Sequence, residues 1–278
     1  MATEVSHNLT QDHYTESGEH IVSRGRSVTD IGSWLKKGWM DMAHAPAASL
    51  FYGAIMALSV LLVYTSFRET PIMMFKIATF FVMLTPFLAT GLYATSCQLS
   101  RNEKPNLTSS MFAWRNNKAE FAFFALILGV VIAIWGRITP LIAAIVESNS
   151  LLIIDPNQGV MSFLTSDAGQ SFMVYFMVGA ASLSAIVFAL SVVTIPLLLR
   201  DHNIGVISAM ILSMKVVMQN KLVMSVWALT IGILVSLGIV TFGLAMLVVM
   251  PLLGYASWHA FNDLIVVDDK RATDDIQL

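Results

Sequence analysis

The chain has 278 residues, of which 56% are hydrophobic and only 12% are charged, and its formal net charge is −2. Soluble domains carry about 25% charged residues, so a fold in water would leave large apolar patches exposed. The composition therefore excludes an ordinary soluble protein and predicts an all-α membrane protein, because helices satisfy their own backbone hydrogen bonds in lipid. The single cysteine, Cys97, excludes an intramolecular disulfide and a cysteine-rich metal site.

The polar ends of the chain are expected to flank one membrane domain over residues 28–265. Residues 1–27 lack the apolar core of a secretory signal, and they contain too few apolar side chains to offset the entropy of ordering. A disordered N-terminal tail is therefore predicted. Residues 266–278 are acidic and are expected to form a second disordered tail.

An interfacial helix over residues 28–44 is predicted first, followed by six membrane-spanning helices, each of which needs about 20 apolar residues. In chain order the spans are 47–67, 72–97, 119–146, 171–199, 222–240 and 243–264. The last two belong to one long apolar run, which a tight turn near residues 241–243 is expected to divide. The sequence thus predicts a six-helix bundle.

Amphipathic stretches precede the first, third and fifth spans. In the first, Ile31, Trp34, Leu35, Trp39 and Met42 fall at helical spacing, opposite Lys36, Lys37 and Asp41. Residues 106–118 and 203–221 repeat this pattern in shorter or more apolar form. Helices of this kind lie at the bilayer surface, with their apolar side chains toward the lipid.

The basic residues indicate the orientation, since cytoplasmic segments of membrane proteins are rich in Lys and Arg. With the N-terminus in the cytoplasm, 13 of the 16 basic residues lie inside, and the outer connection 147–170 has none. Both termini are therefore predicted to be cytoplasmic.

Each returning span contains one proline, namely Pro86, Pro196 or Pro251. This spacing is compatible with a threefold repeat of an interfacial helix and a helical hairpin. Proline is also common in membrane helices generally, so the repeat remains one of two interpretations.

Arg137 and Lys76 are the only lysine or arginine residues within the predicted spans. Arg137 lies about 27 Å along its helix, near the outer boundary and close to Trp135, which favours an interfacial anchor over an anion contact. No Asp or Glu lies deep in a span, and this counts against a carboxylate proton relay.

Three histidines, His44, His202 and His259, are predicted at the cytoplasmic boundary. They could meet around a metal, but they show no ligand spacing along one helix, and the sequence contains no His-Glu-x-x-His motif. We therefore predict no metal site and no cofactor. His259 and Trp258 close the run "VVMPLLGYASWHAFNDL" (248–264) and are expected to anchor the last helix in the head groups.

Four segments resemble the bacterial predicted integral membrane proteins known as domain of unknown function 2189. They are "WLKKGWMDMAHAPAASLFYG" (34–53), "TPFLATGLYATSCQLSRNEKPNL" (85–107), "FALSVVTIPLLLRDHN" (188–203) and "VMPLLGYASWHAF" (249–261). The resemblance implies a multi-span inner-membrane protein of bacteria and brings no established activity. The last motif of the family often has histidine where this chain has Tyr255, so a histidine ligand pair with His259 is missing here.

The leading hypothesis is a non-enzymatic membrane protein that binds or assembles a partner, such as another membrane protein, at its cytoplasmic face. Polar and aromatic residues gather there, including Trp34, Trp39, Asp41, Arg200, Asp201, Trp258 and Asn262. The alternative is a transporter or channel for a small or lipid-like solute, with the three prolines as flexing points. No catalytic set can be assembled, so an enzyme is not expected, and no motif for nucleic acid is present.

Overall fold

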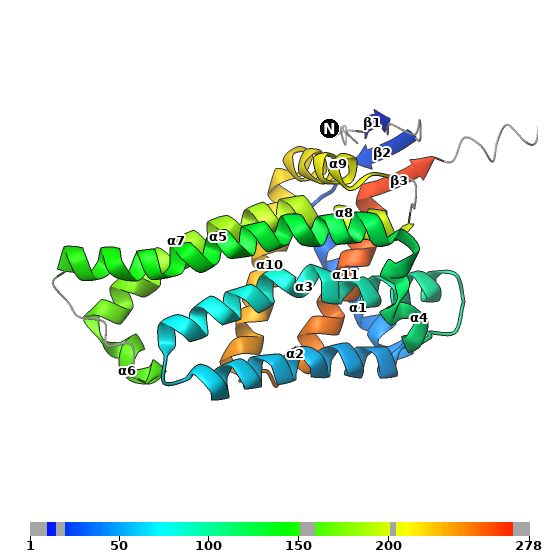
Figure 1. Ribbon diagram of the computed structural model, residues 1–278. Helices are drawn as coiled ribbons and strands as arrows, with labels where there is room; N and C mark the ends of the chain where they lie inside the picture. The colour runs from blue at the N-terminus through cyan, green and yellow to red at the C-terminus, as the bar shows by residue number, and fades with distance from the viewer. Residues whose placement is uncertain (1–9, 15–19, 151–158, 201–203, 269–278) are drawn as a thin grey trace, which may run out of the picture.

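The computed structural model describes residues 10–14, 20–150, 159–200 and 204–268, which form a helical bundle with a small sheet (Figure 1). The helices are α1 Asp30–His44, α2 Pro46–Phe67, α3 Pro71–Ser100, α4 Leu107–Met111, the 3-10 helix η1 Ala113–Asn117, α5 Lys118–Ser150, α6 Val160–Thr165, α7 Asp167–Ser191, α8 Thr194–Arg200, α9 Val206–Gln219, α10 Lys221–Val240 and α11 Met246–Leu264. The strands are β1 Thr10–Tyr14, β2 His20–Arg24 and β3 Ile265–Asp268.

Five helical segments in the described part of the chain are long and apolar enough to cross a membrane. They are Pro46–Phe67, Pro71–Ser100, Ala113–Val146, Asp167–Arg200 and Lys221–Val240, and they correspond to the first five predicted spans. The sixth prediction, 243–264, coincides with α11, which is not among the five. Its second half is more polar than a typical span because it contains Ser257, His259, Asn262 and Asp263.

Helix α11 lies in the middle of the largest hydrophobic core and contacts α1, α2, α3 and α10. Two glycines allow this close packing. A Cβ on Gly38 of α1 would lie 2.8 Å from the backbone nitrogen of Ala256, and one on Gly53 of α2 would lie 2.6 Å from the carbonyl oxygen of Leu247. The backbones of three helices therefore touch, and most of the surface of α11 faces protein.

The apolar face of α1 lies against α11. The amphipathic pattern had led us to expect this face against lipid, so this expectation is corrected. Ile31 and Trp34 are buried in the core, whereas Trp39 remains 55% exposed. The reason is that an apolar helical stripe packs equally well on lipid and on a neighbouring helix, and only the tertiary structure selects between them. The expected apolar face of α9 is not covered by protein, because the side chains of Ile207, Ile211, Met214 and Met218 are exposed.

The fourth predicted span, 171–199, is interrupted between α7 and α8 at residues 192–193. Pro196 causes this break, because it has no N–H to donate to the carbonyl of Val192 and its ring clashes there. Ser213 of α9 fills the gap. Its hydroxyl donates to the carbonyl of Ala189 at 2.7 Å and accepts from the N–H of Val193 at 3.2 Å.

Replacing Ser213 by alanine is expected to destabilise the protein by about 1–3 kcal/mol, because two buried backbone groups lose their partner. The measurement is the free energy of unfolding of the purified protein in detergent. Ser182→Ala is the matched control, since its exposed hydroxyl bonds only to the carbonyl of Val178 within the same helix. Equal effects of the two substitutions would show that the Ser213 bridge contributes nothing.

The two polar ends of the chain meet in one antiparallel sheet of order β1-β2-β3. Thr10 pairs with Arg24, and His20 pairs with Asp268. Residues 10–14, 20–24 and 265–268 thus differ from the disordered tails that we expected over 1–27 and 266–278. The β-branched run of β3 favours a strand, and β2 gains a hydrogen-bonded neighbour on each side, which the composition of either tail alone does not reveal.

Candidate functional site

A polar cluster joins α1, α3 and α11 near the end of α11 that leads into the sheet. Its centre is Asp41, whose Oδ2 lies 2.8 Å from Nε2 of His259 and also accepts a hydrogen bond from the hydroxyl of Ser96. Because an ionised carboxylate can only accept, Nε2 of His259 carries the proton in this pair. The side chains of His259 and Asp41 are 19% and 15% exposed, so the pair is largely withdrawn from water.

Hydroxyl groups of α2 continue this cluster towards the core. The hydroxyl of Tyr255 lies 3.1 Å from that of Ser49, which donates to the carbonyl of Ala45 at 2.8 Å. The hydroxyl of Tyr52 lies 3.2 Å from that of Ser110 in α4. These contacts tie α11, α2 and α4 together by polar groups that are almost fully enclosed.

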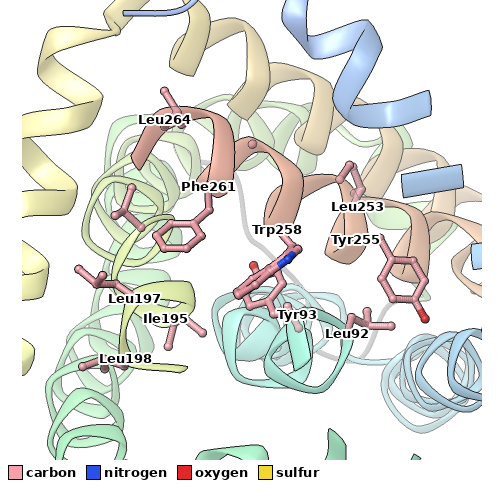
Figure 2. Close-up of a cluster of buried hydrophobic side chains, with 14 of the residues drawn as sticks. Leu92, Tyr93, Ile195, Leu197, Leu198, Leu253, Tyr255, Trp258, Phe261 and Leu264 are labelled. Atoms are coloured by element: carbon pink, nitrogen blue, oxygen red, sulfur yellow. The ribbon is translucent and has the colours of Figure 1, made fainter. Parts of the chain in front are cut away.

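Trp258 points from α11 towards α3 and the ring of Tyr93 (Figure 2). The two rings are stacked with centroids 6.4 Å apart, and Trp258 also contacts Phe261. Trp258 is only 3% exposed, and its Nε1 has no hydrogen-bond partner among the residues that the structure describes. The interpretation of Trp258 as a head-group anchor is therefore wrong, because protein surrounds α11 at this level.

A second polar cluster gathers around Asp263 at the last turn of α11. Nε1 of Trp34 donates to its carboxylate at 2.8 Å, and Nζ of Lys37 lies 3.8 Å from the other carboxylate oxygen. The guanidinium of Arg26 donates twice to the backbone carbonyl of Asp263, at 2.8 and 2.6 Å. The segment before α1 is thereby fastened to the end of α11.

The other predicted site residues lie apart from these clusters. His44 is exposed and donates from Nδ1 to the carbonyl of Met40. Arg200 is exposed, with Nη1 3.3 Å from Oδ1 of Asn262, and Arg137 is exposed on α5. Asp201 and His202 lie outside the described residues.

The prolines occupy three different helices. Pro86 lies inside α3 and Pro251 inside α11, and both helices continue through them. Pro196 lies in α8, just after the break described above. Pro196 and Pro251 are buried.

Trp135 also differs from the expectation of an aromatic at the membrane surface. It is 2% exposed and packs against Phe176 of α7. Together with Phe163 and Phe172 it belongs to a second, smaller hydrophobic core beside α6. Arg137, two residues further along the helix, points outwards from this core.

Sequence reasoning missed Ser96 as a member of the first cluster and the pairing of Trp34 with Asp263. Serine is common in membrane helices, so Ser96 carries no distinguishing signal. Asp41 and His259 were each recognised as candidates, but a separation of 218 residues gives no hint that they meet.

The first cluster is a set of largely buried hydrogen bonds that connect neighbouring helices. Ser96 donates to Asp41 and not to His259, so the nucleophile–base hydrogen bond of a hydrolytic triad is missing. Within the described residues, no group of three His, Cys, Asp or Glu side chains is placed to hold a metal ion. Asp41 and His259 are thus arranged to hold α1 and α11 together.

Residues 72–200 match the family model described as predicted integral membrane protein (DUF2189). This match confirms the family resemblance over that part of the chain and, with the apolar helices, the membrane location of the protein. No curated protein and no solved structure matches the chain.

Proposed function

We propose that this protein is a non-enzymatic membrane protein that binds a partner protein through the exposed face of α1. This face, defined by Lys36, Lys37, Trp39, Met40 and His44, is exposed on a helix whose other side is fastened to α11. Trp39 and Met40 are 55% and 50% exposed, and they stand beside two lysines. Aromatic and methionine side chains are enriched at the centres of interfaces, whereas charged side chains such as these lysines belong to the polar rim.

The rigidity of α1 supports this proposal. Gly38 brings α1 against the backbone of α11, the Asp41–His259 pair binds its second half, and the Trp34–Asp263 hydrogen bond binds its first half. A helix held in this way presents Trp39 and Met40 in one orientation, which lowers the entropy lost on association.

A photo-crosslinking residue at position 39, introduced in cells, tests the proposal. We expect a discrete protein adduct that Lys36→Glu weakens, because this exposed lysine takes no part in the contacts between α1 and α11. Position 229 is the matched control, because Leu229 is 62% exposed in the middle of a candidate span, where only lipid is expected. Lipid adducts alone at position 39, or the same protein adducts at both positions, would contradict a partner site.

The pairing of both chain ends in one sheet supports a position of both ends on the same side of the membrane, and the proposed side is the cytoplasm, in a bacterial inner membrane. Since β2 precedes all the spans and pairs with β3 after α11, an even number of crossings is needed. With the five candidate segments, α11 supplies the sixth crossing. The basic residues of the segments around Arg26, Lys37 and Arg101 favour the inside for this end.

Cysteine accessibility checks this topology in a Cys97→Ser background. A membrane-impermeant maleimide is expected to label Ser162→Cys in intact cells, but Ser27→Cys and Glu103→Cys only after permeabilisation. All three original residues are exposed, so access depends on the side of the membrane. Labelling of Ser27→Cys and Ser162→Cys from the same side would refute the six-crossing arrangement.

A transporter or channel remains the second candidate, and the break between α7 and α8 favours it. Interrupted helices often border solute sites in transporters, and Pro86 and Pro251 lie in two further helices of the same bundle. Solute flux through liposomes that contain only this purified protein would support this candidate. A stoichiometric partner without such flux would support the first.

A further inference from the structure

The turn between α10 and α11 is apolar. Thr241 is the only polar residue among residues 237–249. The side chains of Val240, Phe242 and Leu244 are 74%, 54% and 72% exposed. Turns that face water are usually rich in Ser, Asn, Asp, Gly and Pro. Residues 240–244, which we call the hairpin tip, instead present three large apolar side chains to their surroundings.

Two contacts place the hairpin tip beside the second half of α2. A Cβ on Gly243 would overlap the carbonyl oxygen of Ala57. The ring centroid of Phe242 lies 4.7 Å from that of Tyr64. Ala57 is the twelfth of the 22 residues of α2, so it lies about 16 Å along a helix that is about 33 Å long. The tip thus stops short of the end of α2 that leads into α3 (Figure 1).

The end of α2 marks one surface of the bilayer. Exposed Arg68 and Glu69 follow it directly, and a helix of 22 residues matches the hydrocarbon thickness of about 30 Å. The depth of the hairpin tip is therefore that of the hydrocarbon. Helices α10 and α11 are long enough to pass further, but they run obliquely to α2 and α3 (Figure 1).

The other end of this hairpin is polar and lies at the level of the sheet. The backbone N–H of Arg26 donates to Oδ1 of Asn220, which directly precedes α10, at 2.8 Å. The guanidinium of Arg26 donates to the carbonyl of Asp263 in the last turn of α11 at 2.6 Å. Residues 222–258 contain no Asp, Glu, His, Lys or Arg. The hairpin thus extends from the side of the chain ends into the apolar part of the bundle.

The backbone of the turn forms its hydrogen bonds within the turn. The N–H groups of residues 241–249 all donate to acceptors among residues 237–245. Thr241 completes this set, because its Oγ1 accepts from the N–H of Ala245 at 3.0 Å and donates to the carbonyl of Leu237 at 2.9 Å. An N–H group without a partner is strongly unfavourable in lipid, where water cannot replace the acceptor. This turn meets the condition that lipid imposes.

The conformation of Phe242 points in the same direction. Its φ is +54°, in the left-handed region. Turns in water usually carry Gly, Asn or Asp in this conformation, and a bulky residue there is an outlier. A phenylalanine at this position offers no polar group to water, but its ring gains contact with an apolar solvent.

We propose that the hairpin tip is a lipid-binding surface, which ends among the acyl chains inside the bilayer. Its partner is the hydrocarbon of the lipids, because the exposed side chains are apolar and the N–H groups of the turn are bonded internally. The proposal narrows the fifth and sixth crossings described above. Helices α10 and α11 enter the bilayer together and turn inside it, without reaching the water on the far side.

This inference is separate from the partner face on α1 and from the choice of the cytoplasmic side. Two helices that enter and leave together keep both chain ends on one side of the membrane, whether or not their turn emerges. The depth of the tip can be measured without knowing which side faces the cytoplasm. Its failure and that of the proposed function are therefore distinguishable.

Nitroxide labels at positions 240 and 244 test the depth of the tip. The protein, with Cys97→Ser and either Val240→Cys or Leu244→Cys, is reconstituted in vesicles of phosphatidylethanolamine and phosphatidylglycerol. Electron paramagnetic resonance then compares collisions of the label with oxygen, which concentrates in lipid, and with a nickel chelate, which stays in water. Glu69→Cys is the matched control, since this exposed residue lies in the polar turn between α2 and α3.

We expect collisions with oxygen to exceed those with nickel at positions 240 and 244, and the reverse at position 69. An excess of nickel collisions at both tip positions would place the turn in water and overturn the proposal. Low accessibility to both reagents would also overturn it, because protein would then cover the tip. Both original side chains are exposed, so the labels require no repacking, and two positions guard against a local effect of either label.

Discussion

Gly38→Ala is expected to lower the free energy of unfolding by about 1–3 kcal/mol, because the added methyl group has no space between α1 and α11. It would lie 2.8 Å from the nitrogen of Ala256 and 2.9 Å from the carbonyl oxygen of Leu252. Both are backbone atoms, so no side-chain rotation relieves the contact and the two helices must separate. The measurement is unfolding of the purified protein in mixed detergent micelles.

Gly32→Ala on the same helix is the matched control. A Cβ at this position meets no atom within 4 Å, so the substitution brings only the better helix propensity of alanine. We expect stability to stay constant or to rise by up to about 1 kcal/mol. If Gly38→Ala were as stable as Gly32→Ala, α1 would not be packed on the backbone of α11.

Asp41→Ala is expected to cost about 2–4 kcal/mol, because it leaves the N–H of His259 and the hydroxyl of Ser96 without their acceptor inside the protein. The cost lies below that of a fully enclosed pair, since Asp41 and His259 retain some contact with water. The measurement is again the free energy of unfolding, together with the double variant Asp41→Ala with His259→Ala.

The double-mutant cycle isolates the pair from the rest of the cluster. We expect a coupling free energy of about 0.5–3 kcal/mol between Asp41 and His259. His44→Ala is the control on the same helix, because that exposed imidazole bonds only to the carbonyl of Met40, and its effect is expected to stay within about 0.5 kcal/mol. Additive effects of Asp41→Ala and His259→Ala would contradict a direct interaction.

The candidate site shows the limit of local patterns. Asp41 and His259 are recognisable as polar residues at the ends of apolar helices, and Tyr255 and Trp258 as aromatics in the same motif. Their partners lie between 55 and 218 residues away in the chain, and Ser96 resembles any other helical serine. Nothing in the periodicity of one helix tells which of its faces meets a neighbour.

Trp258 and Trp135 illustrate the same point for aromatic residues. Both stand near the ends of apolar runs, where tryptophan is typical of the membrane surface. In the structure Trp258 stacks on Tyr93, and Trp135 packs on Phe176. Whether a tryptophan side chain is exposed at the membrane surface depends on how many helices surround its own helix. That number is a property of the whole bundle.

The sequence by itself determined the membrane class, the positions of the apolar helices and the turn near residues 241–243, because helix length and hydropathy are local quantities that lipid imposes on each segment separately. Pro46 and Pro71 even mark the first turns of α2 and α3. The tertiary structure alone decided that α11 is enclosed by its neighbours and that the chain ends pair in one sheet. Both features depend on contacts between distant segments of the chain. Close helix packing at glycines, polar side-chain pairs and strand pairing form only when two such segments meet.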